Sequence, residues 1–325
     1  MPSGITHILL TKELQNGNLD QDLKDILADS EAFLTIGTVA PDLPYGSIAD
    51  IDTFLLRQSG MADNFHYLKT NQIPLQSLQI LKSLRDKTDE EVFFQMFTFF
   101  LGYISHVVAD GIIHPYIRDH VGDYKDHKTE HRALELKLDV LYFSFLRKNT
   151  SDLSELMFSD IQKELLNYKS SPKWEETFQL FSRLISDVYG GIDTIDNISG
   201  WIQGLENMFS LASDDYPNII RGQLTDSIIY QNANSIATAD VLFLTKPVFD
   251  RDNTFCYRDK VDYFNDCIPR FFTKFEPIVQ NAYNFVFNGG PPLTENDIPA
   301  IDLDTGRLLS VHNNLDIVPE FWKEH

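Results

Sequence analysis

The chain has 325 residues, of which 43% are hydrophobic and 24 are phenylalanine, so it can bury a large core and is not a disordered protein. Its 48 acidic residues outnumber its 27 Lys and Arg residues, which gives a formal net charge of −21. This charge disfavours long nucleic acids and anionic membrane surfaces as partners, because like charges repel.

Helical spacing of apolar residues extends over most of the chain and predicts an all-α fold. Residues 34–53 differ because proline and glycine interrupt them, and we expect Asp42 to lie there in a loop or at the start of a helix. The best strand candidate is 241–244. The predicted helices cover residues 19–29, 74–87, 88–120, 130–146, 152–168, 174–190, 194–213 and 258–286.

No linker divides the chain, so we expect a single all-α domain over residues 1–325. Within it we distinguish a metal-site core (1–150), a helical extension to which the sequence assigns no role (151–290) and an extended tail (291–325). The longest apolar stretch is interrupted by polar residues, which indicates a buried helix and no transmembrane segment. The amino terminus lacks the pattern of a signal peptide, and two cysteines are too few for a disulfide framework, so we expect a cytoplasmic protein.

The most informative spacing lies in the predicted helix 88–120. His106, Asp110 and His114 follow one another at intervals of four residues, which brings them to nearly the same face of a helix. Most of their neighbours are apolar, so this face is expected to be buried. His131 and Glu135 repeat the interval on the next predicted helix, and Asp139 lies one turn further along.

Buried imidazole and carboxylate groups are costly unless something compensates for them. Taken alone, His106 is more typical of a hydrogen-bonded core histidine, and the His131/Glu135 pair is more typical of a solvated surface pair. Together they favour a divalent cation, and nitrogen and oxygen ligands without thiolate suit zinc. Four further histidines are expected to play no part: His120 and His127 as exposed residues, and His312 and His325 in the tail.

Four segments give the sequence a likeness to a known family. They are residues 4–7 (GITH), 36–44 (IGTVAPDLP), 100–110 (FLGYISHVVAD) followed by His114-Pro115, and 131–139 (HRALELKLD). In order and spacing they resemble the zinc-dependent phospholipase C family, which includes the amino-terminal domain of glycosylphosphatidylinositol-specific phospholipase D. The resemblance implies a multi-helix bundle with metal ligands on facing helices and a cluster of two or three zinc ions.

Carried over residue by residue, the resemblance implies that His7 binds a first zinc ion and that Asp110 bridges it to a second. A third ion would be held by His114, His131 and Glu135, with Asp139 as the alternative to Glu135. Secreted members bind one zinc ion through a processed amino terminus, and the corresponding group here would be the Pro2 amine after removal of Met1. Asp42 is also the expected general base. The eight implied ligands are His7, Asp42, His66, His106, Asp110, His114, His131 and Glu135.

The resulting prediction is an enzyme: a zinc-dependent phosphodiester hydrolase resembling phospholipase C. It would act through metal-activated water on a phospholipid head group or a small phosphodiester. Two alternatives stay open, a single-strand nuclease-like hydrolase and a non-catalytic metal-binding interaction protein. Arg118 and Arg132 lie close enough in sequence to contact a phosphate, although the pattern favours solvated surface arginines.

Overall fold

The structure of the chain is a computed structural model. It describes residues 4–50, 58–149, 158–190, 195–212, 236, 243–244, 261–311, 314 and 317–323. Within these ranges the regular structure is almost entirely helical, which confirms the predicted all-α fold class.

The described helices follow one another along the chain, with one short pair of strands before the last long helix. The α-helices are α1 (Gly4–Leu14), α2 (Gln21–Asp29), α3 (Glu31–Gly37), α5 (Gly60–Tyr67), α6 (Gln72–Leu84), α7 (Glu90–Val121), α8 (Lys128–Asn149), α9 (Phe158–Lys163), α10 (Trp174–Tyr189), α11 (Ile195–Ala212) and α14 (Ile268–Phe287). The others are the 3-10 helices η1 (Ala40–Ala49), η3 (Glu164–Ser170) and η6 (Glu320–Trp322), the π-helix η5 (Tyr263–Cys267), and strands β1 (Phe243–Leu244) and β2 (Val261–Asp262).

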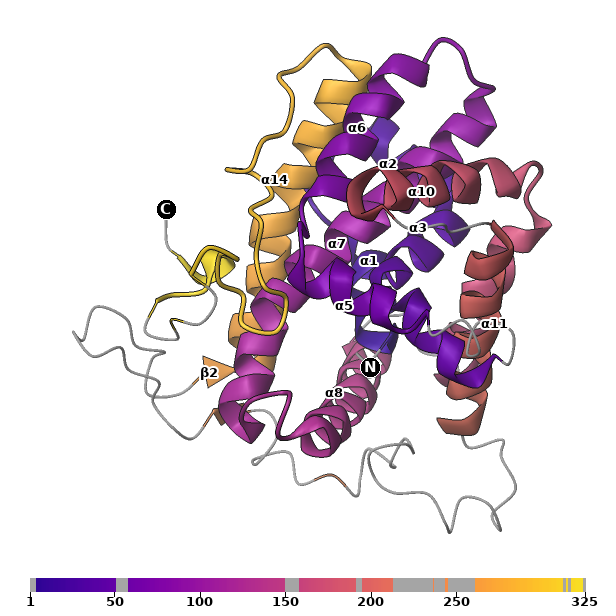
Figure 1. Cartoon of the computed structure of the whole chain (residues 1–325). Helices are drawn as coiled ribbons and strands as arrows, with labels where there is room; N and C mark the ends of the chain where they lie inside the picture. Colours follow the sequence, from indigo (N-terminus) through magenta and orange to yellow (C-terminus); the bar gives the residue numbers. More distant parts are fainter. Residues whose placement is uncertain are drawn as a thin grey trace.

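The 32-residue helix α7 is the centre of the structure, and α1, α3, α6, α8, α10 and α14 all contact it (Figure 1). It begins with Glu90 and Glu91, where the helix dipole favours acids, and it ends at Val121, just before Gly122, whose φ of 103° suits glycine. By length and composition α7 is apolar enough to cross a membrane, but 94% of its most apolar window is buried inside the protein. A helix that is apolar on all sides is expected in a core, in agreement with the predicted buried helix.

Some predicted boundaries differ from the observed ones. The helix predicted over 258–286 begins only at Ile268, because Asp262 accepts hydrogen bonds from the backbone N–H groups of Phe264 and Asn265 and starts η5. The helix predicted over 152–168 is divided into α9 and η3 in its described part. Of the strand candidate 241–244, the described half is β1, which pairs antiparallel with β2.

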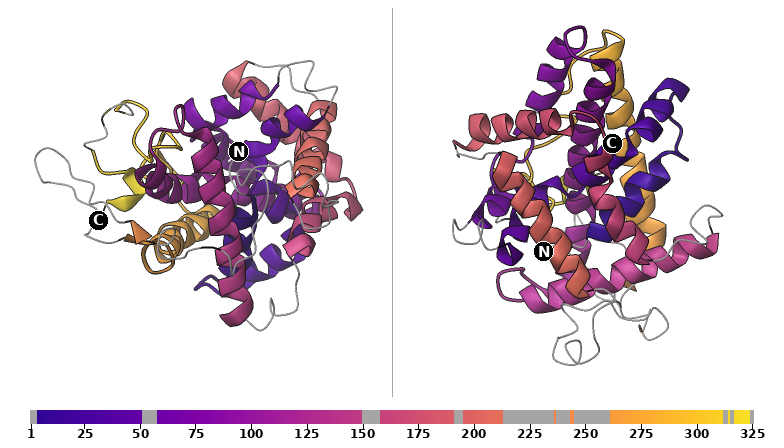
Figure 2. Two further views of the ribbon diagram at one scale, coloured as in Figure 1. Left: turned by 90° about the horizontal axis from the view of Figure 1, so that it is seen from below. Right: turned by 90° about the vertical axis from the view of Figure 1, so that its right-hand side faces the viewer.

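The segment after α14 has no described helix before η6, and it packs back against α7 (Figures 1 and 2). Ile298, Ile301 and Leu303 are buried, and the indole nitrogen of Trp322 donates a hydrogen bond to the Ile112 carbonyl at 3.0 Å. One hydrophobic cluster includes side chains from Ile5 to Trp322. The described part of the predicted tail therefore contributes to the same core as the amino-terminal helices.

Helices α3 and α7 cross at two glycines. A Cβ atom added to Gly102 would lie 2.4 Å from the carbonyl oxygen of Leu34, and one added to Gly37 would lie 2.1 Å from that of Phe99. Both distances are too short for a real contact, so only glycine allows the two backbones to approach this closely. The crossing fixes the position of Thr38, the residue that follows α3 and lies beside His106.

We therefore expect Gly102→Ala to lower the free energy of unfolding by about 1–3 kcal/mol, because the new methyl group meets backbone atoms of α3 that cannot rotate away. Alanine favours a helix interior by roughly 0.5–1 kcal/mol over glycine, but the steric cost exceeds this gain. Gly60→Ala is the control, since nothing lies within 4 Å of its added Cβ. Denaturant unfolding of both variants measures the difference, and equal stabilities would contradict the close crossing.

Candidate metal centre

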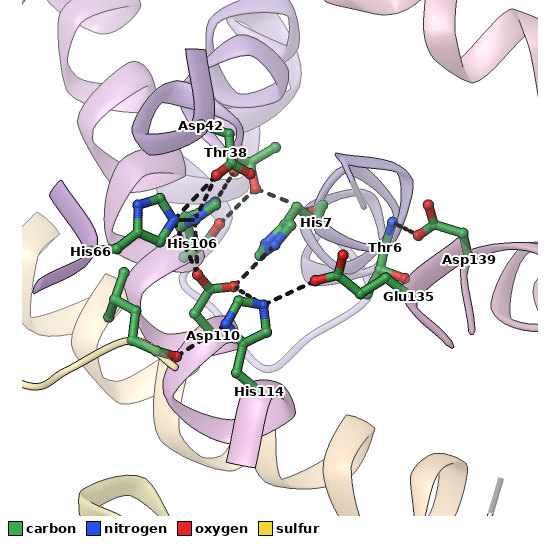
Figure 3. A network of polar contacts seen from close by, with 12 residues as sticks. Thr6, His7, Thr38, Asp42, His66, His106, Asp110, His114, Glu135 and Asp139 are labelled. Carbon is green, nitrogen blue, oxygen red and sulfur yellow. Dashed lines mark hydrogen bonds and ion pairs between the residues drawn. The ribbon is translucent and has the colours of Figure 1, made fainter. Parts of the chain in front are cut away.

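Five elements contribute ionisable side chains to one buried site (Figure 3). Helix α1 provides the first histidine, η1 and α5 provide an acid and a histidine, α7 provides three residues, and α8 provides two. Every one of these residues is at most 8% exposed. They are His7, Asp42, His66, His106, Asp110, His114, His131 and Glu135, so the structure brings together all eight residues that were predicted as ligands.

The site consists of three groups of side chains whose ligand atoms lie within 4.8 Å of one another. Each group contains imidazole nitrogen and carboxylate oxygen and is fully buried. The groups are His7, His106 and Asp110; Asp42, His66 and His106; and His114, His131 and Glu135. Each of them could hold a metal ion, and the role of these residues as ligands stays a prediction.

Asp110 is the residue at which the groups meet. Its Oδ1 atom lies 3.2 Å from His7 Nε2 and 3.5 Å from His114 Nε2. Its Oδ2 atom lies 3.1 Å from His106 Nε2 and 3.6 Å from His66 Nε2. The two oxygens therefore face different histidines, as the proposed bridge between two ions requires.

The spacing of these atoms suits zinc. Two atoms that each lie about 2.1 Å from a tetrahedral ion are about 3.4 Å apart. The corresponding distances here are 3.1 Å from His66 Nε2 to Asp42 Oδ1, and 3.2 and 3.3 Å from Glu135 Oε1 to His131 and His114 Nε2. A small void of about 10 Å³, lined in part by His7, Asp110, His114 and Glu135, lies between two of the groups.

Backbone carbonyls fix the orientation of three imidazole rings. The Nδ1 atoms of His66, His106 and His114 lie 2.7, 2.9 and 3.1 Å from the carbonyl oxygens of Ala62, Thr38 and Leu303. A carbonyl only accepts, so Nδ1 carries the proton and Nε2 of the neutral ring presents a lone pair to the cluster. Metal-binding histidines are usually held in this way.

The inward-facing atoms lack hydrogen-bond donors. The Nε2 atoms of His66 and His106 lie only 3.4 Å apart. Both oxygens of Asp42, Oδ2 of Asp110 and Oε2 of Glu135 are buried without a hydrogen-bond partner among the described residues. Lone pairs and carboxylate oxygens that face one another in a buried site need either protons or a cation between them. The donor set therefore fits a bound divalent metal.

The electrostatics of the cluster favour positive charge. Burial alone would raise the pKa of Asp110, but the imidazoles of His106 and His114 hold it well below its usual range. Burial would lower the pKa of His114, but the carboxylates of Asp110 and Glu135 raise it to about 10. The carboxylates of Asp110 and Asp42 raise the pKa of His106 to about 8, against the effect of burial. His7 is the exception, because burial and the neighbouring His106 ring lower its pKa.

Asp139 serves a different purpose from Glu135. Its Oδ1 atom accepts a hydrogen bond of 2.7 Å from the backbone N–H of Thr6, in the first turn of α1 (Figure 3). A carboxylate at this position satisfies a free N–H and interacts favourably with the helix dipole. Glu135 faces His114 and His131, which favours it as the ligand of the third group. Residues 1–3, and with them the Pro2 amine, lie outside the described residues.

Several expectations about neighbouring residues were wrong. Arg118 is not a solvated arginine, because its side chain is largely buried and pairs with both Asp123 and Asp304. Arg132 is also largely buried, with Nη1 3.7 Å from Glu135 Oε2. His120 is half-buried against Tyr116, at a ring separation of 4.6 Å. His127 is exposed as expected, while His312 and His325 lie outside the described residues.

A cavity of about 640 Å³ lies beside the cluster, and no motif in the sequence predicts it. Two of its lining residues contact predicted ligands: the Tyr124 ring lies 5.0 Å from that of His131, and the Tyr67 ring lies 6.2 Å from that of His66. Residues of both charges also line it. These are Asp63, Lys69, Arg118, Asp123, Lys125, Lys128, Asp302 and Asp304.

Comparison with known proteins agrees with this site. A family model described as zinc dependent phospholipase C matches residues 6–191, which include all eight predicted ligands. No curated protein and no solved structure matches the chain.

The different surroundings of the two acids on α8 lead to a direct prediction. Glu135→Gln is expected to lower the amount of zinc bound per chain, because it removes a carboxylate that faces two histidines. Asp139→Asn is the control, since an amide oxygen can still accept the bond from Thr6, and it is expected to bind as much zinc as the wild type. Metal analysis after equilibration with zinc measures both. Loss of zinc in Asp139→Asn with full retention in Glu135→Gln would reverse the assignment.

Proposed function

The chain belongs to the zinc-dependent phospholipase C family, and we propose that it is a zinc-dependent hydrolase of phosphodiesters. Its substrate is a phospholipid head group or a small phosphodiester. The observation that carries the proposal is the convergence of buried carboxylates and carbonyl-oriented imidazoles around Asp110, in an arrangement that a divalent cation would stabilise.

The ligands divide among two or three ions as follows. His7 and Oδ1 of Asp110 would hold the first, and Oδ2 of Asp110 would join Asp42, His66 and His106 around the second. The third would be held by His114, His131 and Glu135. Zinc supplies a Lewis acid for the phosphoryl oxygens and lowers the pKa of water to about 7.

Side chains of the protein would accept the proton of the attacking water and hold the neighbouring groups in place. Asp42 is 3% exposed and neither of its oxygens has a hydrogen-bond partner among the described residues, so it is free to accept a proton from the attacking water. Its helix η1 is held by α11, where backbone atoms of Gly46 and Gly204 are in close contact. The hydrogen bonds of His66 and His106 to carbonyls keep their rings fixed beside Asp42.

The cavity beside the cluster supports a substrate of limited size. Its volume of about 640 Å³ falls within the range of roughly 300–1,000 Å³ that is usual for small-molecule sites. The rings of Tyr67 and Tyr124 form an apolar wall next to His66 and His131. Leu68 also lines the cavity and is 54% exposed, so an apolar part of a lipid could contact it.

The charge of the chain argues against the nuclease alternative. Three zinc ions would offset only part of the net charge of −21, and a long polyanion would still meet an acidic surface. The length of the candidate ligand set and the absence of cysteine from it favour a catalytic cluster over a closed structural site.

The proposal is tested with zinc-loaded protein and a panel of a phosphatidylcholine analogue, a nitrophenyl phosphodiester and single-stranded DNA. We expect hydrolysis of a lipid or small diester and a loss of about 100-fold or more in kcat for Asp42→Asn, because the proton acceptor is removed. Asp86→Asn, which alters an exposed acid outside the site, is expected to retain full activity.

Two results would contradict the proposal. Wild-type protein that binds zinc and cleaves none of the three substrates would favour the non-catalytic alternative. Preferred cleavage of single-stranded DNA would favour the nuclease. If Asp42→Asn kept wild-type kcat, the general-base role would be wrong.

A further inference from the structure

The described part of the chain's carboxyl-terminal segment, residues 293–311, 314 and 317–323, packs against α7, the helix that carries three of the predicted ligands (Figure 1). We call it the C-terminal arm. It lies outside residues 6–191, the region that the family model matches. Any contact between the arm and the site therefore comes from residues that the family model does not match.

One residue of the arm contacts two helices that carry predicted ligands. The carbonyl oxygen of Leu303 accepts a hydrogen bond from Nδ1 of His114 on α7, at 3.1 Å. The backbone N–H of Leu303 donates to the carbonyl oxygen of His66 on α5, at 3.0 Å. The backbone of Leu303 thus connects the second group of side chains to the third.

The three carbonyl-oriented histidines depend on the arm to different degrees. The carbonyls that orient His66 and His106 belong to Ala62 and Thr38, which lie within the family-matched region. For His114 the carbonyl belongs to Leu303, which is 189 positions away in the sequence. Among these three rings, the arm orients only the one that belongs to the third group.

The arm is anchored next to Leu303 by specific bonds. The Thr70 hydroxyl donates to the carbonyl oxygen of Ile301 at 2.7 Å and accepts from its backbone N–H at 3.1 Å. The Asn71 amide donates to the Ile298 carbonyl at 3.1 Å. Thr70 and Asn71 are both buried, and neither is a predicted ligand.

A second set of contacts holds the arm against α7. Asp304 pairs with Arg118, and Gly306, with a φ of +65°, approaches the α7 backbone so closely that an added Cβ would lie 2.5 Å from the Gly111 carbonyl oxygen. Pro115 lacks the N–H that would normally bond to this carbonyl, so α7 is open to the arm one turn before His114.

We infer that the C-terminal arm is a working part of the metal centre, which fixes the Nδ1–H tautomer of His114 and so strengthens zinc binding by the third group. The inference rests on the metal binding put forward above. Loss of an outer partner of a metal-binding histidine usually weakens affinity by about 10–100-fold. Because linkage is reciprocal, zinc in the third group must also stabilise the docked arm.

The first test removes one anchor of the arm, the bonds between Thr70 and Ile301, without altering a predicted ligand. Thr70→Val deletes the hydroxyl that holds Ile301, whereas Thr70→Ser keeps it and is the matched control. Zinc dissociation is followed by competition with a chelator, which resolves the release of each ion as a separate step. The step that is altered in Glu135→Gln is assigned to the ion of the third group. We expect Thr70→Val to weaken that step by about 10-fold and leave the others unchanged. Equal weakening of all steps would indicate a merely structural role.

The second test uses hydrogen exchange and does not require Thr70→Val to fold. Zinc is expected to slow exchange of backbone amides at residues 301–306 in the wild type, and to do so much less in Glu135→Gln. Zinc binding without any change in the arm would contradict the inference and leave the proposed hydrolase intact. If zinc slows exchange in the arm but the protein hydrolyses no phosphodiester, the inference stands and the proposed hydrolase activity is contradicted. A chain that binds no zinc would contradict both the inference and the proposed activity.

Discussion

The buried carboxylate of Asp110 is the constraint on which the rest of the site depends. It is 1% exposed, and four imidazole nitrogens lie within 3.6 Å of its two oxygens. Carbonyls fix several of these rings so that lone pairs face the acid, an arrangement that is unfavourable without protons or a cation. A protein that keeps this arrangement in its core needs a compensating positive charge, and zinc suits the nitrogen and oxygen donors.

The surrounding fold has the features needed to hold such a site rigid. Helix α7 carries three of the predicted ligands and is covered by packed helices, so their positions are set by the core and not by a loop. The glycine crossing of α3 and α7 brings the Thr38 carbonyl to His106, and Asp139 fixes the start of α1 near His7. Backbone contacts thus orient side chains that come from distant parts of the chain.

Much of this could be predicted from the sequence, because helical periodicity is a local property. The four-residue spacing of His106, Asp110 and His114 predicts one helix face, and the structure has that face buried at the cluster. Three features could not be predicted. The contact between Leu303 and His114 uses a backbone carbonyl, which every residue type has, so the sequence does not reveal it. The pairing of Arg118 with Asp304 depends on the tertiary fold, because the two residues are far apart in the sequence. The late start of α14 reflects capping by Asp262, which overrides an otherwise helical pattern.

We propose above that the buried groups around Asp110 hold zinc. The most direct measurement is a crystal structure of the zinc-loaded protein with diffraction data collected on both sides of the zinc absorption edge. We expect two or three anomalous peaks inside the cluster, with Asp110 between two ions and one ion held by His114, His131 and Glu135. A fully ordered cluster with no anomalous peak among these residues, in crystals that contain saturating zinc, would contradict it.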